Sequence, residues 1–266
     1  MRLLERRNAI QNLLFFIRWK LWLVILSAPG HLAFALRGWG DARAGIWRRL
    51  RLAWRLIRIH LSLQCAHSPM ELLTIVEEVL RVPPSVDGVV VECGCYLGGS
   101  SAKLSLAVEL AGRRLIVCDS FEGLPETSAA DDLPGADPFR PGDFAVRLDL
   151  VRENVRRWGS LSVVEFVPGW FQDTLPRLNG QRIACAFLDV DLQESIRTCI
   201  EHLWKGVQPG CRVFVHDADR PPVIEPFEDA TWWQRRFNTP PPSFVGARRG
   251  LGPLRRLLGF AIKAES

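Results

Sequence analysis

Between residues 88 and 263, short apolar runs alternate with stretches of helical periodicity. The strand-like runs cover residues 88–92, 114–118, 162–167, 183–188, 211–215, 243–247 and 257–263. The main helical stretches cover residues 100–111, 146–158, 192–206 and 222–236. Strands that are apolar on consecutive residues are buried on both faces, which is typical of a parallel sheet covered by helices. The pattern therefore predicts an α/β fold with a mainly parallel seven-stranded sheet and helices on both faces.

The first quarter of the chain differs from the rest in charge. Residues 1–61 contain twelve Lys or Arg and two acids, whereas the whole chain carries a net charge of only +5. A new helix is expected after residue 67, because Ser68 is a natural N-cap, Pro69 suits the first helical position and Glu71 completes a capping box. We therefore divide the chain into a basic helical extension, residues 1–65, and an α/β domain, residues 66–266.

Two segments make up the extension. Residues 13–36 are apolar, but Pro29 and Gly30 interrupt the uncharged run of 16 residues from 21 to 36. A spanning helix needs about 20 apolar residues, and a signal peptide fits poorly because Arg18 and Lys20 lie inside the apolar stretch. Residues 43–61 predict an amphipathic helix with one apolar and one arginine-rich face. Its apolar face comprises Ile46, Trp47, Leu50, Ala53, Trp54, Ile57 and Leu61.

Two interpretations of residues 1–62 remain open. A basic helix with tryptophans is typical of a peripheral segment at a membrane interface, here the inner face. The alternative is an arm that packs on its own domain or on a second subunit, so a homo-oligomer also remains open. Nucleic-acid binding is disfavoured, because the rest of the chain is acidic. The seven cysteines include no CxxC pair and mostly lie in apolar runs, which favours a reduced, cytoplasmic protein.

A glycine-containing turn follows the first strand of the domain. The sequence from Val89 to Ser101 reads VVVECGCYLGGSS. In open α/β sheets, ligands bind at the carboxyl ends of the strands, so we expect a cofactor to contact Glu92, Gly94, Gly98 and Ser100. The acid suits a cationic group such as the amino group of a methionyl moiety. The pattern lacks G-x-G-x-x-G, which disfavours an NAD-dependent oxidoreductase.

A second candidate site lies 27 residues after Glu92. Asp119 follows the second strand, where nucleoside-binding α/β proteins place a carboxylate that accepts hydrogen bonds from ribose hydroxyls. Ser120 and Phe121 come next and are included in the predicted cofactor site.

From residue 119 to residue 125 the chain reads DSFEGLP, and from 168 to 176 it reads PGWFQDTLP. With the Glu-x-Gly loop, these strings resemble the macrocin O-methyltransferase family over about residues 66–263. The resemblance implies a Rossmann-like class I methyltransferase fold, S-adenosyl-L-methionine as methyl donor and, often, a divalent cation such as Mg²⁺ or Mn²⁺. It also implies that Gly169, Trp170 and Phe171 lie near the adenine.

Acidic residues and a histidine follow two later strands. Asp189 and Asp191 come after residues 183–188, and His216 and Asp217 come after residues 211–215. Oxygen ligands from two neighbouring loops suit a hard divalent cation, so Asp189, His216 and Asp217 are the expected metal ligands. Asp189, Asp191 and His216 are the expected catalytic residues. In the family an acid stands where this chain has His216; histidine is a poor Mg²⁺ ligand and could instead be the general base.

These patterns together predict an S-adenosylmethionine-dependent O-methyltransferase that acts on a hydroxyl of a small molecule, by resemblance a sugar or a glycosylated or lipid-linked metabolite. Two alternatives stay open. One is methylation of a nitrogen or a carboxylate. The other is a catalytically inactive Rossmann scaffold at a membrane, which the joint presence of Glu92, Asp119, Asp189 and Asp217 disfavours.

Overall fold

A computed structural model describes residues 9–37, 45–132, 135 and 137–265, with side chains from residue 18 onward. Its centre is a seven-stranded sheet in the order β3-β2-β1-β4-β5-β7-β6. The strands β1 to β5 are parallel, and β7 runs antiparallel to both of its neighbours. This topology confirms the predicted class I fold. The strand bounds are β1 Val89–Cys93, β2 Leu115–Asp119, β3 Val164–Pro168, β4 Ile183–Leu188, β5 Val207–Val215, β6 Phe244–Val245 and β7 Gly259–Ile262.

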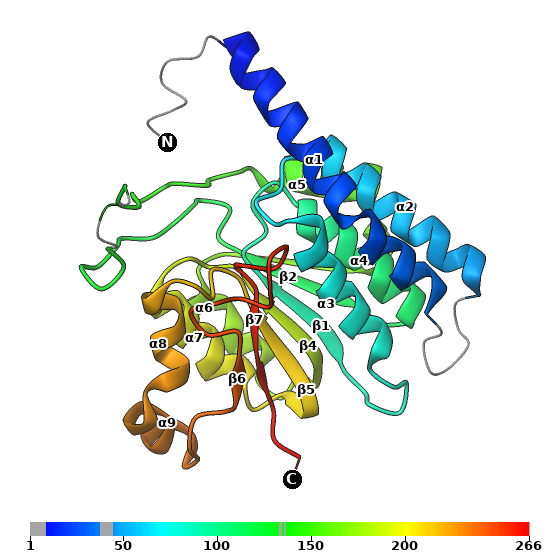
Figure 1. The fold of residues 1–266 in the computed structure, drawn as a ribbon. Helices are drawn as coiled ribbons and strands as arrows, with labels where there is room; N and C mark the ends of the chain where they lie inside the picture. Colours follow the sequence, from blue (N-terminus) through cyan, green and yellow to red (C-terminus); the bar gives the residue numbers. More distant parts are fainter. Residues whose placement is uncertain (1–8, 38–44, 133–134, 136, 266) are drawn as a thin grey trace.

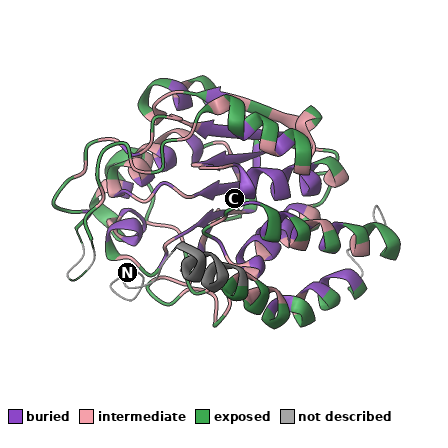
Figure 2. Ribbon diagram, turned by 90° about the horizontal axis from the view of Figure 1, so that it is seen from above, coloured by how far each residue is buried: buried purple, intermediate pink, exposed green. Residues whose placement is uncertain are grey.

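Helices cover both faces of the sheet (Figure 1). One face carries α3 Pro69–Arg81, α4 Gly99–Ala111 and α5 Leu148–Trp158; the other carries α6 Phe171–Thr174, α7 Gln193–Leu203, α8 Pro221–Glu228 and α9 Ala230–Phe237. The short 3-10 helices η1 Leu161–Val163 and η2 Leu175–Leu178 precede β3 and β4. Figure 2 shows the central strands buried between these layers. Ser68 caps α3 with the predicted capping box.

The expected single helix at 222–236 is two helices in the structure. Asp229 separates them, with backbone angles outside the helical region, and its carboxylate accepts a hydrogen bond from the backbone N–H of Trp232 at 2.9 Å. A short polar side chain that satisfies a free N–H of the next helix is a start signal for that helix. The periodicity of residues 222–236 did not reveal it.

The extension forms an outer layer, because α1 Ala9–Leu36 and α2 Ile46–Ser62 pack over α3 and α4 (Figure 1). The expected interruption at Pro29 is wrong: α1 continues through it. Gly30 packs directly on Met70 of α3, where an added Cβ would come within 2.4 Å of the sulfur. This close packing supports the helix where proline removes a backbone hydrogen bond. The segment Arg18–Leu36 is now long and apolar enough, by length and composition, to cross a membrane.

Four of the seven residues of the predicted apolar face of α2 are exposed in the structure. Leu52, Leu56 and Ile59 are buried in the core cluster that includes residues of α3 and α4, whereas Trp47 and Trp54 of the predicted apolar stripe are 79% and 55% exposed. The helix therefore has apolar residues on two sides. Periodicity alone could not tell which side meets the protein.

Candidate active site

A cavity of about 960 Å³ lies at the carboxyl ends of the parallel strands. Backbone hydrogen bonds hold the loops around it together. Gly94 N–H donates to the carbonyl of Cys118, and Asp189 N–H donates to the carbonyl of Cys93, both at 2.9 Å. Of the predicted site residues, those that line the cavity are Gly94, Asp119, Ser120, Trp170, Phe171, Asp189, Asp191, His216 and Asp217.

The turn after β1 brings backbone to the cavity wall. Gly94 has φ +82, and a Cβ there would lie 1.9 Å from the carbonyl oxygen of Asp189. Only glycine fits this close approach, which supports the predicted role of the position. Gly98 also has a positive φ, and it caps the start of α4 beneath the loop.

The structure places five of the predicted cofactor contacts away from the cavity lining: Glu92, Gly98, Ser100, Phe121 and Gly169. Glu92 is fully buried, and its Oε2 accepts a hydrogen bond from the hydroxyl of Ser101 at 2.5 Å. Burial raises the pKa of Glu92 to about 7, although hydrogen bonds from Ser100 and Ser101 oppose the shift. The hydrogen bond between Glu92 and Ser101 therefore connects β1 to the first turn of α4.

The raised pKa of Glu92 predicts a pH-dependent stability. A carboxyl whose pKa rises on folding stabilises the folded state when protonated, and this contribution is lost as pH rises through the folded pKa. Glutamine does not titrate, so only wild type loses this contribution. As pH rises from about 5 to about 8, we expect the free energy of unfolding of Glu92→Gln to increase relative to that of wild type by up to about 3 kcal/mol. Urea unfolding at both pH values measures this, with the exposed Glu122→Gln as control. Parallel pH curves for Glu92→Gln and wild type would refute it.

Asp119 holds two loops at the end of β2. Its Oδ2 accepts the N–H of Cys95 and its Oδ1 accepts the N–H of Phe121, both at 2.7 Å. Its side chain thus orders the glycine turn and its own loop while it faces the cavity. Trp170 and Phe171, after β3, form a neighbouring aromatic wall.

Asp191 and Asp217, which follow β4 and β5, also line the cavity and have unusual backbone conformations. Their φ values are +60 and +54, a left-handed conformation that non-glycine residues rarely adopt and that is enriched at functional sites. Burial and the nearby carboxylates of Asp189 and Asp217 raise the pKa of Asp191 to about 8. Arg220 Nη1 lies 3.8 Å from a carboxylate oxygen of both Asp191 and Asp217.

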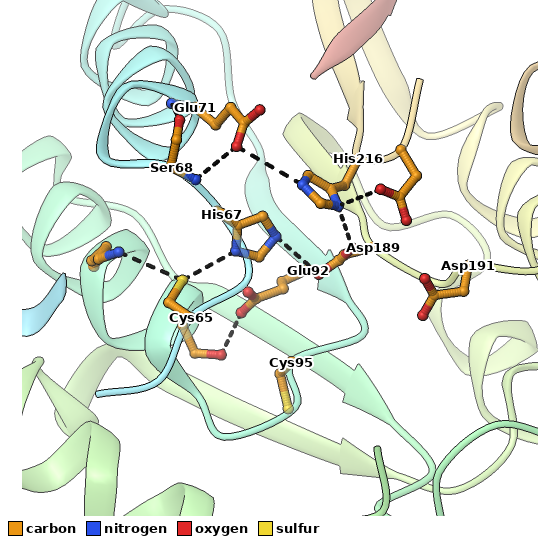
Figure 3. Close-up of polar contacts among 12 residues, drawn as sticks. Cys65, His67, Ser68, Glu71, Glu92, Cys95, Asp189, Asp191 and His216 are labelled. Atoms are coloured by element: carbon orange, nitrogen blue, oxygen red, sulfur yellow. Dashed lines mark hydrogen bonds and ion pairs between the residues drawn. The ribbon is translucent and has the colours of Figure 1, made fainter. Parts of the chain in front are cut away.

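Asp189 lies between two histidines (Figure 3). Its Oδ2 is 2.9 Å from Nε2 of His67, and its Oδ1 is 3.1 Å from Nδ1 of His216. Burial opposes the charged forms, but the mutual attraction dominates: it lowers the pKa of Asp189 and raises the pKa values of His67 and His216. Sequence reasoning missed His67. It directly precedes the capping box of α3, but no local signal showed that α3 starts beside the ends of β4 and β5.

The extension also contributes to the cavity, which the sequence did not reveal. Trp19, Lys20 and Leu23 of α1 and His60 of α2 line its wall. Lys20 Nζ donates a hydrogen bond to the carbonyl of Leu63 at 2.9 Å. The first two helices are therefore part of the site's enclosure.

The family profile described as macrocin-O-methyltransferase (TylF) matches residues 68–234. The chain belongs to this family. The matched segment begins one residue after His67 and includes β1 to β5 with the acidic positions at their ends.

Several characterised proteins are similar to this chain. An 8-demethyl-8-(2,3-dimethoxy-alpha-L-rhamnosyl)-tetracenomycin-C 4'-O-methyltransferase of Streptomyces olivaceus is 41% identical over 149 residues, 53% of this chain and 56% of that protein. A demethyldecarbamoylnovobiocin O-methyltransferase of Streptomyces niveus is 35% identical over 140 residues, 50% of this chain and 53% of that protein. The chain thus spans about half the length of these relatives.

Among solved structures, the O-methyltransferase NovP superposes with a TM-score of 0.57 at 24% identity, over 76% of this chain and 84% of that one. The calicheamicin methyltransferase CalS11 gives 0.56 at 17% identity, over 86% and 99%. These two likenesses establish the shared fold.

Proposed function

We propose that this protein transfers a methyl group from S-adenosylmethionine to a hydroxyl of a sugar-bearing small molecule. The observation that carries the proposal is that one cavity joins a nucleoside-type site, formed by Asp119 and Trp170, to an acidic wall formed by Asp189 and Asp191. Family membership and the activities of the relatives, which include a methyltransferase that acts on a rhamnosyl tetracenomycin, support the same reaction.

The residues around Gly94 fit the donor. The backbone of the turn approaches the cavity because no side chain intervenes, Asp119 can accept from ribose hydroxyls, and Trp170 and Phe171 offer apolar surface for a base. S-adenosylmethionine supplies an electrophilic methyl group on a sulfonium. The chain's part is to hold donor and acceptor in line, which alone lowers the barrier substantially.

Asp191 is the best-placed general base. It lines the cavity two residues from Asp189, and a base with a pKa near the working pH is effective in proton transfer. In the proposed reaction Asp191 takes the proton of the acceptor hydroxyl while the hydroxyl oxygen attacks the methyl carbon; the bond between that carbon and the sulfonium sulfur breaks, and S-adenosylhomocysteine leaves.

A divalent cation fits the acidic wall. Nε2 of His67, which faces Asp189, is buried without a hydrogen-bond partner among the described residues, and this is uncommon unless a ligand completes the site. Asp189, His216 and Asp217 are the residues expected from the family pattern to hold it. Such an ion supplies Lewis acidity that lowers the pKa of a hydroxyl.

The direct experiment is incubation of the full chain with methyl-labelled S-adenosylmethionine and a panel of glycosides, with NMR of the product. The expected result is a new methoxy signal on a sugar carbon. Label on nitrogen or on a carboxylate would support the alternative acceptors, and failure to bind the donor by calorimetry would favour an inactive scaffold.

We also propose that the extension attaches the enzyme to the inner face of an anionic membrane. Among the described residues, eleven of fourteen exposed large apolar side chains lie on α1 and α2, including Trp22, Ile25 and Trp47. Exposed arginines Arg48 and Arg51 lie on the same helix as Trp47. Apolar surface next to basic side chains complements an anionic bilayer surface.

The membrane proposal predicts that the full-length protein sediments with anionic vesicles at low salt. Trp22→Glu combined with Ile25→Glu should lower the bound fraction about tenfold or more, because two exposed apolar side chains are lost from the contact. Leu150→Glu, an exposed leucine on α5, is the matched control and should bind like wild type. A full-length protein that stays in the supernatant as a dimer would show instead that a second copy covers this face.

A further inference from the structure

The side chains around Asp189 indicate a different set of metal ligands from the one that the family pattern implies. Three potential ligand atoms, one each from His67, Asp189 and His216, lie within 4.8 Å of one another. They come from the loop before α3 and from the ends of β4 and β5, and in Figure 3 the three side chains point toward one another. We propose that His67, Asp189 and His216 form a metal centre that prefers a transition-metal ion such as Zn²⁺ to Mg²⁺.

The spacing of the donor atoms fits an ion. Bonds of about 2.0–2.1 Å place neighbouring ligand atoms about 3.0–3.4 Å apart. Oδ2 of Asp189 lies 2.9 Å from His67 and Oδ1 lies 3.1 Å from His216, so the two oxygens of the carboxylate each approach one imidazole at close to this spacing. The contact to His67 nevertheless lacks hydrogen-bond geometry, because Nε2 of His67 has no hydrogen-bond partner among the described residues. A bound ion would give this buried nitrogen a partner.

Surrounding contacts fix the two imidazoles in orientation. Nδ1 of His67 contacts Sγ of Cys65 at 3.2 Å, which leaves Nε2 directed at Asp189. Nδ1 of His216 lies 3.1 Å from Asp189, while its Nε2 is within ion-pair distance of Glu71, at 3.9 Å, without forming a hydrogen bond. Glu71 is itself held, because its two oxygens accept the backbone N–H groups of Ser68 and Leu257 at 2.7 and 3.0 Å. Outer contacts of this kind orient the histidines of metal sites.

The chemistry of the donors decides which ion binds. Two imidazoles and one carboxylate suit Zn²⁺, Mn²⁺ or Fe²⁺, whereas Mg²⁺ prefers an all-oxygen set. His67 and His216 are only 4% and 5% exposed, and all three side chains border the cavity. We take His67 as the third ligand in place of Asp217, because His67, Asp189 and His216 are the residues whose ligand atoms all lie within 4.8 Å of one another. The inference rests on the proposed function only for the ion's role in methyl transfer.

Metal binding can be measured without the reaction. The full-length protein, stripped with a chelator, is titrated with Zn²⁺ and with Mg²⁺ by calorimetry, and with Co²⁺ by its visible absorption bands. We expect one Zn²⁺ per chain, bound at least about 100-fold more tightly than Mg²⁺. We expect His67→Ala and His67→Gln each to weaken Zn²⁺ binding about 100-fold or more and to change the Co²⁺ spectrum.

His60→Gln is the matched control, because His60 is also buried and lines the cavity but lies outside the cluster. It should leave Zn²⁺ affinity unchanged. Unchanged affinity in both folded His67 variants, or loss in Asp217→Asn alone, would overturn the proposal, as would equal affinity for Mg²⁺ and Zn²⁺. Zn²⁺ binding without methyl transfer would instead refute only the proposed function.

Discussion

Replacing Asp191 with asparagine is expected to reduce kcat about 10²–10⁴-fold, the usual contribution of a general base. Asparagine keeps the size of the side chain and cannot take the hydroxyl proton. The left-handed conformation at Asp191 is also well tolerated by asparagine, so the loop should keep its shape. Single-turnover methyl transfer with the identified acceptor measures the effect, while calorimetry should show donor binding within about twofold of wild type.

Glu194→Gln is the control for this prediction. Glu194 lines the same cavity and stands at the start of α7, but it is exposed, and its carboxylate lies 3.8 Å from Arg197. Its loss should leave kcat nearly unchanged. Equal, small effects of both substitutions would remove Asp191 as the base and leave His216 or the ion itself to activate the hydroxyl.

The second large effect is expected on donor binding. Asp119→Ala should raise the Kd for S-adenosylmethionine about 10- to 100-fold, because a charged hydrogen-bond partner is lost and the N–H groups of Cys95 and Phe121 lose their acceptor. Calorimetric titration measures this directly. The structure adds a reason that the sequence did not offer, since Asp119 shapes the glycine turn as well as facing the ligand.

Two comparisons make the donor prediction specific. Glu126→Ala, an exposed carboxylate that also lines the cavity, should bind the donor like wild type. Asp119→Asn keeps one acceptor oxygen and should fall between alanine and wild type. Wild-type affinity in a folded Asp119→Ala protein would exclude Asp119 from the donor site.

Much of the fold could be predicted locally. Runs of consecutive apolar residues marked the strands to within a few residues, and Ser68 with Glu71 marked the start of α3. The placement of Asp119 and Asp189 at one rim followed from a general rule, because parallel strands end on the same side of a sheet. These features depend on neighbours in sequence or on the topology of the whole class.

The rest was decided by contacts between distant segments. Glu92 is at the end of a strand, as expected, but packing against α4 turned its carboxylate toward Ser101 and away from the cavity. The sequence predicts an interruption at Pro29, but α1 continues past this residue, and the packing of Gly30 against Met70 supports the helix there.

By itself the sequence determined the parallel sheet, the strands that are followed by candidate site residues, and the family. Hydrophobic periodicity and short motifs suffice for this because they are local properties of the chain. Only the tertiary structure decided that His67 meets Asp189 and His216, and that Trp19 of the extension borders the cavity. His67 precedes Asp189 by more than a hundred residues. The physical reason is that α3 must bury its apolar face against β4, and this long-range burial brings the residue before the helix to the ends of β4 and β5.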